Sequence, residues 1–388
     1  MSEQNQNRIP VHEPDIGEEE IASVVAALRR GEISGSFGTA LPEFEHSFAA
    51  YVGCKHGIAV TSGTSALHLA VKAAGVGEGH EVLMSASTNI ATALAAFNNN
   101  AVSVPVDSEN VTWNLDPSLI ERLITPQTRA IIPVHLFGHP CEMDRIVEIA
   151  KKHKLAVIED CAESHGASWK GRMTGSFGDM ACFSFYANKV ITTGEGGMVV
   201  TNNDELARKL RLLRNMAFGK PRFRHEVAGH NFRMTGYQAA MGLAQLRKID
   251  QIIAEKRRVA QTYNRLLQGI QGLQLPAEIT GAVNVYWMYA VVVNPEFGIS
   301  RDELASYLEK HGIETRTFFC PMNQQPFLRS QAGFRDIPCP VADTLWERGL
   351  YLPSANRLDE ASITRVCAAI REASADAVGG KAPSSLKG

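Results

Sequence analysis

The sequence lacks the features that mark exported, membrane-spanning and nucleic-acid-binding proteins. No apolar run approaches the roughly 20 residues that a helix needs to cross a bilayer, and no hydrophobic segment follows the polar N-terminus MSEQNQNR. Lys and Arg number 39 and Asp and Glu 41, for a formal net charge of −2 over 388 residues. Such a chain has no overall positive field to attract nucleic acid or an anionic membrane. We therefore expect a cytoplasmic protein that binds neither.

Cysteine pairs and nucleotide-binding glycine motifs are also missing. The seven cysteines occur singly, in an odd number and without zinc-ribbon spacing, which favours reduced thiols over a disulfide framework. The chain has no convincing GxGxxG and no GxxxxGKS/T motif, so dinucleotide-dependent redox enzymes and NTPases are disfavoured. We expect no metal site.

Between residues 55 and 205 the sequence alternates short apolar, β-branched runs with amphipathic helical stretches. This pattern is typical of an α/β sheet built from crossover connections. Helices are expected over 64–75 and 143–154, which have helical apolar spacing and suitable C-terminal residues. The candidate strands are 57–61, 81–85, 102–107, 129–136, 155–159, 179–185 and 197–201. They predict one wide, mostly parallel seven-stranded sheet.

The rest of the chain predicts a second, smaller unit. From about residue 235 a long stretch with few helix breakers indicates a connecting pair of helices. The last third has α+β character, with strands and helices expected at 285–293, 301–311, 349–352 and 359–373. Because the chain exceeds one core of typical size, we expect a large domain, a small α+β domain and a disordered tail, over residues 10–250, 251–374 and 375–388.

The segment FSFYANKVITTGEGGMVVTNN contains the first candidate for chemistry, Lys189. It follows a predicted strand in a loop, so its side chain is expected to project from the sheet edge into a cleft. Partial desolvation there lowers the pKa of a lysine and provides a neutral amine that can form a Schiff base with a carbonyl cofactor. A solvated surface charge is the ordinary alternative for a loop lysine.

Asp160 ends the apolar run LAVIE, at the carboxyl end of a predicted strand, where open α/β sheets bind their ligands. In a pyridoxal-phosphate site a carboxylate at this place pairs with the pyridine nitrogen and keeps it protonated. A helix N-cap is the alternative interpretation.

The segment AVTSGTSALHL provides hydroxyls and backbone amides where a strand meets a helix. Gly63, Thr64 and Ser65 lie at the expected helix N-terminus, which suits a phosphate. Simple helix capping is again the alternative. The later GEGG at 194–197 precedes a strand, which is the wrong order for a nucleotide loop, and indicates a close backbone approach.

The order of phosphate turn, strand-end Asp, strand-end Ser and loop Lys resembles the fold type I aminotransferases. The segments SGTSALHL, VHLFG, VIEDCAESHGA, FSFYANKVITTGEGGMVVTN and NFRMTGYQAAMGLAQL resemble the sugar aminotransferase family, also called the DegT/DnrJ/EryC1/StrS family. The resemblance covers about residues 10 to 373. It implies a pyridoxal-5'-phosphate enzyme that acts as a homodimer with shared active sites on a nucleotide-linked sugar and an amino-acid donor.

The resemblance also implies the roles of single residues. Lys189 would hold the cofactor covalently and shuttle the proton, Asp160 would pair with the pyridine nitrogen, and Glu163 would lie near the phenolic oxygen. The phosphate would be held by Ser184, Gly63, Thr64 and Ser65.

Further residues are assigned by the same resemblance. The turn with Asn231 and Arg233 would reach into the partner's site toward the phosphate. Apart from the resemblance, Arg316 is a candidate for the nucleotide diphosphate because a guanidinium fork suits phosphate oxygens, and an exposed structural arginine is the alternative. Two positions depart from the family pattern: Asn89 stands where many relatives have an aromatic residue on the cofactor ring, and Asn323 stands where histidine is common near the sugar.

Within the family, WMYAVVV and GIETRTFFCPMNQQPF resemble the perosamine synthases, a subgroup that aminates carbon 4 of GDP-4-keto-6-deoxymannose. This resemblance implies that sugar as substrate, with glutamate as donor. A 3-keto sugar nucleotide or a keto-cyclitol is the alternative substrate, and a non-catalytic sensor with the same fold is the alternative function. Related dehydratases replace the lysine by histidine, so Lys189 argues against dehydration.

Overall fold

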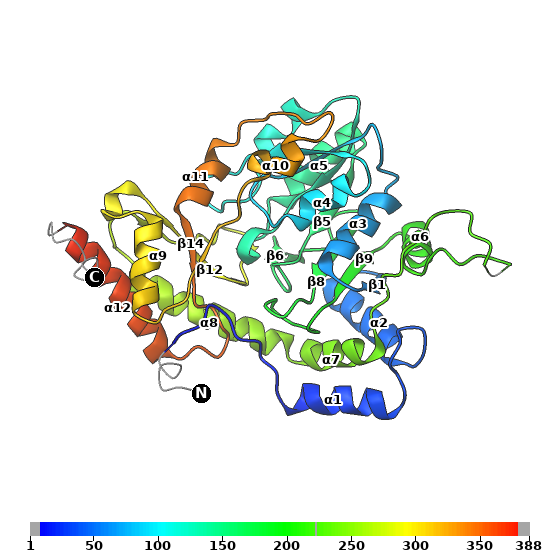
Figure 1. The fold of residues 1–388 in the computed structure, drawn as a ribbon, viewed down its shortest axis with the longest axis horizontal. Coiled ribbons are helices and arrows are strands. Elements are labelled where there is room, and N and C mark those ends of the chain that lie inside the picture. Colours follow the sequence, from blue (N-terminus) through cyan, green and yellow to red (C-terminus); the bar gives the residue numbers. More distant parts are fainter. Residues whose placement is uncertain (1–7, 222, 379–388) are drawn as a thin grey trace.

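A seven-stranded sheet forms the centre of the molecule in this computed structural model, which describes residues 8–221 and 223–378 (Figure 1). The strand order is β1-β9-β8-β5-β4-β2-β3. The neighbours from β8 to β3 are parallel, whereas β9 is antiparallel to both β1 and β8. The predicted mostly parallel sheet is therefore confirmed. Its strands are β1 (His56–Val60), β2 (Glu81–Ser85), β3 (Val102–Val106), β4 (Thr128–Ile132), β5 (Ala156–Asp160), β8 (Met180–Ser184) and β9 (Gly197–Thr201).

One predicted strand is too long. The run 129–136 leaves the strand conformation after Ile132 and enters a short 3-10 turn at Leu136–Gly138. Pro133 follows the last strand residue and has no N–H for the ladder, which explains the early end.

Alternate side chains of the central sheet pack against helices on its two faces. Ile58, Val60 and Val199 lie in the core with α3 and α6, whereas Ala59 and Phe183 point to the opposite face, toward α2 and α7. The helices of the first face are α3 (Gly63–Ala73), α4 (Ala91–Phe97) and α6 (Asp204–Arg214), and those of the second are α2 (Ala40–Val52), α5 (Met143–His153) and α7 (Gly236–Arg247). The sheet is thus buried on both faces, and its carboxyl edge is left for ligands.

The C-terminal part forms a second, antiparallel sheet with the order β10-β12-β14-β13. A separate hydrophobic core joins this sheet to three helices and includes Tyr263, Tyr289 and Ile370. The strands are β10 (Leu273–Gln274), β12 (Tyr289–Val293), β13 (Arg316–Thr317) and β14 (Gly349–Leu352), and the helices are α8 (Ile249–Leu267), α9 (Arg301–Lys310) and α12 (Glu360–Val378). The helix pair expected after residue 235 is present as α7 and α8.

Two predictions about this part are wrong at their ends. The strand expected over 285–293 begins only at Tyr289, because Tyr286 has a φ of 48°, which is incompatible with extended backbone. Helix α12 continues to Val378, so the first residues assigned to a disordered tail are helical. Residues 379–388 of that tail lie outside the described residues, and the boundary at residue 250 stays a prediction.

The remaining elements connect these layers. Helix α1 (Glu18–Arg29) packs on α7 at the edge of the molecule (Figure 1). A small sheet has the order β11-β6-β7, and the other elements are β6 (Ser168–Trp169), β7 (Arg172–Met173), β11 (Ala282–Val283), α10 (Pro326–Arg329) and α11 (Pro340–Arg348). All seven cysteines are free thiols. Across residues 8–221 and 223–378, each helix is too short or too polar to cross a bilayer.

Candidate active site

Lys189 lies in the loop after β8 and points toward the indole ring of Trp287. Its Nζ is 3.8 Å from the centre of that ring, and its backbone N–H donates to the Tyr186 carbonyl at 2.9 Å. Burial lowers the pKa of Lys189, while the nearby carboxylates of Glu163 and Asp160 oppose this shift. The loop lysine is therefore not a solvated surface charge but a partly buried amine of the kind that can act as a nucleophile and base.

Asp160 is the last residue of β5, and its carboxylate is almost completely buried. Thr92 Oγ1 donates to Oδ2 at 2.8 Å, and the Ala162 N–H donates to Oδ1 at 3.1 Å. The residues that directly follow Asp160, 161–167, form turns and not an α-helix, so the N-cap interpretation is wrong. Burial raises the pKa of Asp160 even though these contacts and Lys189 lower it. A cationic partner brought by a ligand would relieve this burial cost.

Glu163 follows three residues later and is also buried. Its Oε2 accepts the Phe137 N–H at 2.8 Å, and Phe137 takes a left-handed conformation, with φ at 52°, in the turn after β4. Burial raises the pKa of Glu163 to about 7, against the opposing charge of Lys189. Near neutral pH this side chain can therefore either donate or accept a hydrogen bond, which suits a phenolic oxygen.

The raised pKa of Glu163 predicts how the stability of the cofactor-free protein depends on pH. The folded protein keeps a proton on Glu163 that the unfolded chain, with an ordinary pKa of 4.5, has already lost. The contribution of Glu163 to the free energy of unfolding is therefore fully present below about pH 4.5 and is lost as the pH rises through about 7. We expect Glu163→Gln to remove up to about 3 kcal/mol of this loss. Urea unfolding of both proteins at pH 5 and pH 8 measures it, and equal pH dependence would contradict the assignment.

The N-terminus of α3 forms the predicted phosphate turn. Ser62 and Ser65 cap the helix reciprocally, since Ser62 Oγ accepts the Ser65 N–H at 3.1 Å and Ser65 Oγ accepts the Ser62 N–H at 2.9 Å. Capping is thus one role of this segment, and it engages the hydroxyl of Ser65. Gly63 and Thr64 begin the helix, so their N–H groups have no acceptor one turn earlier.

Gly63 allows the end of β8 to approach this helix closely. A Cβ at position 63 would lie 2.8 Å from Ser184 Cβ and 3.2 Å from Ser184 Oγ, so any side chain would collide. The first-turn amides of α3 and the hydroxyl of Ser184 therefore share one small space. Together with the helix dipole, these donors suit an anion such as a phosphate.

Three further predicted cofactor residues lie in two other segments. Asn89 is exposed, and its Oδ1 accepts the Ala91 N–H at 3.0 Å, which uses the side chain to start α4. Arg233 pairs with Val60 in a β-bridge and donates to Asn215 Oδ1 at 2.6 Å. Asn231 forms a backbone bridge with Asn215. The turn that contains Asn231 and Arg233 therefore lies beside the phosphate segment of its own chain. Its reach into a partner's site stays a prediction.

The two predicted substrate residues occupy different settings. Arg316 lies exposed on β13 beside an ion-pair partner, Glu314. Arg316 pairs with Tyr351 between β13 and β14, and burial raises the pKa of Tyr351 to about 12, with the charges of Glu163 and Arg316 acting on it in opposite directions. Asn323 is buried, and its Nδ2 donates to Asp343 at 3.3 Å, while its Oδ1 has no partner among the described residues.

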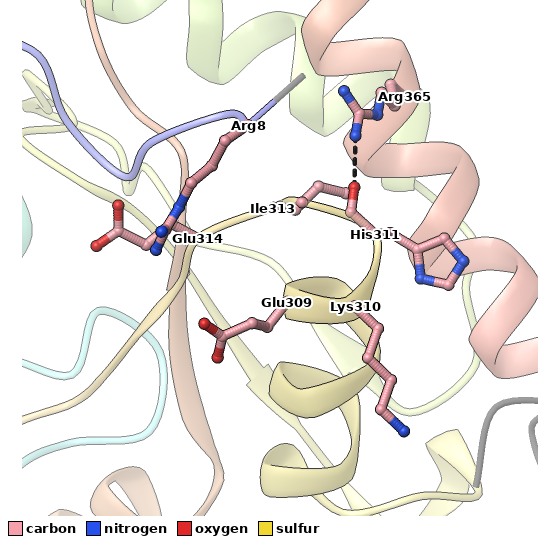
Figure 2. Close-up of a pocket in the computed structure, with 8 residues that line it drawn as sticks. Arg8, Glu309, Lys310, His311, Ile313, Glu314 and Arg365 are labelled. Atoms are coloured by element: carbon pink, nitrogen blue, oxygen red, sulfur yellow. Dashed lines mark hydrogen bonds between the residues drawn. The ribbon is translucent and has the colours of Figure 1, made fainter. Parts of the chain in front are cut away.

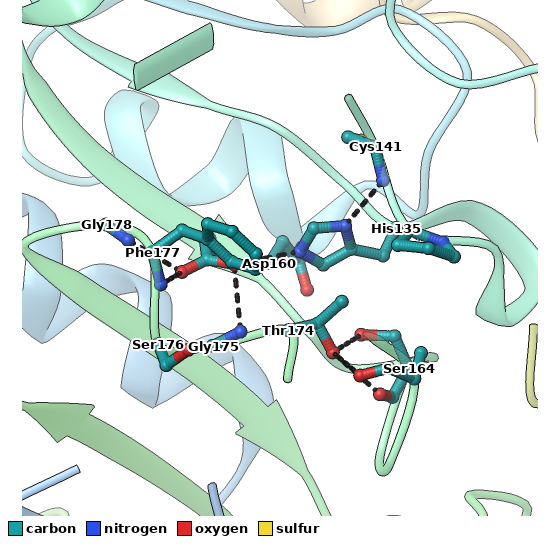
Figure 3. A network of polar contacts seen from close by, with 12 residues as sticks. His135, Cys141, Asp160, Ser164, Thr174, Gly175, Ser176, Phe177 and Gly178 are labelled. Atoms are coloured by element: carbon teal, nitrogen blue, oxygen red, sulfur yellow. Dashed lines mark hydrogen bonds and ion pairs between the residues drawn. The ribbon is translucent and has the colours of Figure 1, made fainter. Parts of the chain in front are cut away.

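A buried network behind Asp160 had no sequence signal (Figure 3). His135 Nδ1 accepts the Cys141 N–H at 3.0 Å, so Nε2 carries the proton and donates to Glu159 Oε2 at 3.1 Å. The Glu159 carboxylate also accepts three backbone N–H groups of residues 175–178, each at 2.8 Å. With Cys161, this is the one metal-like cluster in the described part of the chain. The side chains of His135 and Glu159 are already hydrogen-bonded, so the network fixes the end of β5 structurally.

The residues present fit pyridoxal phosphate. A lysine with a lowered pKa, a buried carboxylate with no ion-pair partner among the described residues and an anion-binding helix N-terminus lie at one edge of the sheet. The buried Oγ of Ser87 and Oδ1 of Asn188, from loops beside Asp160 and Lys189, have no partner among the described residues, as expected where a polar ligand completes a site. The fold and the site thus define an α/β enzyme of aminotransferase type.

Comparisons with known proteins agree with this class. The model of the DegT/DnrJ/EryC1/StrS aminotransferase family matches residues 14–371. GDP-perosamine synthases of Caulobacter vibrioides and Escherichia coli O157:H7 are 43% and 39% identical, over 94% of this chain and 97% and 98% of theirs. The crystal structure of S. venezuelae DesV in complex with a ketimine intermediate superposes with a TM-score of 0.88 and 35% identity, covering 95% of this chain and 98% of that one.

This chain belongs to the DegT/DnrJ/EryC1/StrS aminotransferase family. It has the fold type I architecture and is a sugar aminotransferase, as the sequence motifs predicted. The family implies pyridoxal phosphate as its cofactor. A non-catalytic sensor and a dinucleotide-dependent redox enzyme are not favoured.

Proposed function

We propose that this enzyme transfers an amino group from glutamate to carbon 4 of GDP-4-keto-6-deoxymannose, with pyridoxal 5'-phosphate as cofactor. The observation that carries the proposal is the place of Lys189, whose amine lies over Trp287 and within reach of the charges of Asp160 and Glu163. The names of the relatives from Caulobacter vibrioides, Escherichia coli O157:H7 and Vibrio cholerae support the sugar and the nucleotide.

In this mechanism the cofactor supplies a carbonyl that bonds to amines and a ring that withdraws electrons. Lys189 holds it, and once released its amine takes the proton from the α-carbon of glutamate. In the second half of the reaction the same amine delivers a proton to carbon 4 of the sugar. Asp160 holds a proton at the ring nitrogen, and Glu163 hydrogen-bonds the phenolic oxygen. The amides of Gly63 and Thr64 and the Ser184 hydroxyl bind the phosphate.

We place the sugar nucleotide on the side of the site that the C-terminal part provides. Arg316 offers a guanidinium fork for the diphosphate. The unpartnered Oδ1 of Asn323 offers an acceptor for a sugar hydroxyl.

We propose that the active enzyme is a cytoplasmic homodimer in which Asn231 and Arg233 also serve the partner's site. Helix α1 supports this, since Ile21, Val25 and Leu28 share one face and remain 50%, 38% and 48% exposed. Apolar faces of this kind are typical of contacts between subunits.

The test is to incubate the pyridoxal-phosphate-loaded enzyme with glutamate and GDP-4-keto-6-deoxymannose and to identify the product by mass spectrometry and NMR. We expect the 4-amino sugar nucleotide, formed in step with 2-oxoglutarate. A 3-keto sugar nucleotide and a keto-cyclitol serve as competing substrates in the same assay. Preferential amination of either one would replace the proposed substrate, while the aminotransferase assignment would stand.

A further inference from the structure

Helix α8 carries a lysine whose ammonium group is buried without a carboxylate. Lys256 is 2% exposed, and its Nζ donates to the Trp287 carbonyl at 2.9 Å and to the Ser354 carbonyl at 2.7 Å. Burial lowers the pKa of Lys256 to about 7, and no carboxylate in the described part of the chain lies close enough to raise it again. Burying such a group is costly, and a methionine of similar length would fill the space without that cost. The two hydrogen bonds are therefore what this lysine adds.

The first of these bonds fixes the residue on which the catalytic amine rests. The Trp287 backbone is held by Lys256, and its indole Nε1 donates to the Asn188 carbonyl at 2.6 Å. Trp287 is thus held by hydrogen bonds at both its backbone carbonyl and its indole nitrogen, and Lys189 Nζ lies 3.8 Å from the centre of the ring. A tryptophan face at this distance attracts an ammonium group.

The second bond ties this arrangement to the N-terminal segment. Ser354 donates its backbone N–H to the Val11 carbonyl at 2.9 Å, and the segment continues beside Gly312 and Glu314, where Arg8 and Glu314 line a shared cavity (Figure 2). His12, which follows Val11 in the sequence, has both ring nitrogens buried. Burial and then the charges of Lys256 and Lys189 lower the pKa of His12, to about 3, so a neutral ring lies near both amines.

We propose that Lys256 is a positioning residue for Lys189, acting through Trp287. Lys189 must leave the cofactor in the first half-reaction, move a proton in both and return at the end of the second, so its free amine needs a defined resting place close to the reacting carbon. The face of Trp287 provides that place, and Lys256 keeps the face in position. This inference rests on the proposed function of Lys189 but not on the identity of the sugar.

The test compares Lys256→Met with the wild-type holoenzyme and with Lys248→Met. Lys248 forms an ion pair with the buried Glu20 at 2.8 Å near the start of the same helix, so its loss lowers stability without touching Trp287. Three quantities are measured: the melting temperature, the pH midpoint of the visible absorbance band of the lysine-bound cofactor, and the rate and half-saturating concentration of the glutamate half-reaction.

For Lys256→Met we expect a shifted pH midpoint and a proton-transfer rate about three- to thirty-fold lower, the range of a lost cation–π contact. The half-saturating glutamate concentration should stay within about twofold, because the binding groups are untouched. Lys248→Met should lower only the melting temperature. In the double variant with Trp287→Phe the losses should not add, since both act through one ring.

A purely structural role would show itself as a lower melting temperature of Lys256→Met with a wild-type band midpoint and rate, and that result overturns the proposal. If Lys256→Met does not fold, Lys256→Gln replaces it. Its amide is one bond shorter and cannot reach both carbonyls, so it should shift the midpoint too, and wild-type behaviour would again overturn the proposal. A wild type that reacts with glutamate but not with the keto-sugar refutes the sugar assignment alone.

Discussion

Lys189→Ala is expected to abolish transamination and the visible absorbance band of the bound cofactor. The alanine removes both the covalent attachment and the only proton shuttle that the proposed mechanism uses. Loss of general acid–base catalysis alone costs about 10²–10⁴-fold, and loss of the covalent anchor adds to it. We therefore expect turnover at least about 10⁴-fold below wild type, measured as 2-oxoglutarate release with GDP-4-keto-6-deoxymannose.

The chain offers a matched control for this experiment. Lys170 also holds its ammonium over an indole ring, at 5.0 Å from the centre of Trp169, but it lies on the surface and pairs with Asp144. Lys170→Ala should leave the band and the turnover unchanged. Lys189→Ala with wild-type turnover would remove Lys189 from the mechanism and would refute the central assignment.

Much of the fold was predictable because each central strand is a short apolar run, and because strands in a sheet buried on both faces must be of this kind. The errors occur where a single residue interrupts a longer apolar run. Pro133 ends β4, and the positive φ of Tyr286 delays β12. Apolar periodicity does not report such local backbone breaks.

The site was predictable to the extent that it is built at strand ends. Asp160 and Ser184 close neighbouring parallel strands, and Lys189 follows one of them, so the topology alone brings them to one edge. Thr92 and Trp287 come from segments far away in the chain, and neither was assigned to the site, although Trp287 begins the quoted segment WMYAVVV. Their roles depend on tertiary packing, which periodicity and local motifs do not encode.

The same reason explains why Lys256 was missed. In the sequence it belongs to a run of charged residues in an amphipathic helix, where a lysine normally faces solvent. Only the packing of α8 against Trp287 and Ser354 shows that this one points inward.

Asp160→Asn is expected to separate stability from catalysis. Asparagine keeps one oxygen, which can accept the Ala162 N–H, and its amide nitrogen can donate to the rotatable Thr92 hydroxyl, so the end of β5 should hold its shape. It cannot carry a negative charge, and so it cannot keep the ring nitrogen protonated. Losing one preorganised electrostatic partner of the reaction typically costs about 10²–10³-fold in turnover. We expect a loss in that range, with cofactor still bound, as measured by absorbance and by steady-state kinetics.

Stability should respond in the opposite direction. Since burial raises the pKa of Asp160, the cofactor-free protein loses stability as the pH rises from the ordinary value of 3.8 through the raised one. Asparagine does not ionise, so cofactor-free Asp160→Asn should melt no lower than wild type at pH 7. The difference in melting temperature, variant minus wild type, should be larger at pH 7 than at pH 4. Asp179→Asn is the control, because Asp179 accepts the Val157 N–H at 2.9 Å at the opposite edge of the same sheet. Its activity should stay at the wild-type level. If Asp160→Asn kept more than about a tenth of wild-type turnover, a charge at this position would not be part of the mechanism.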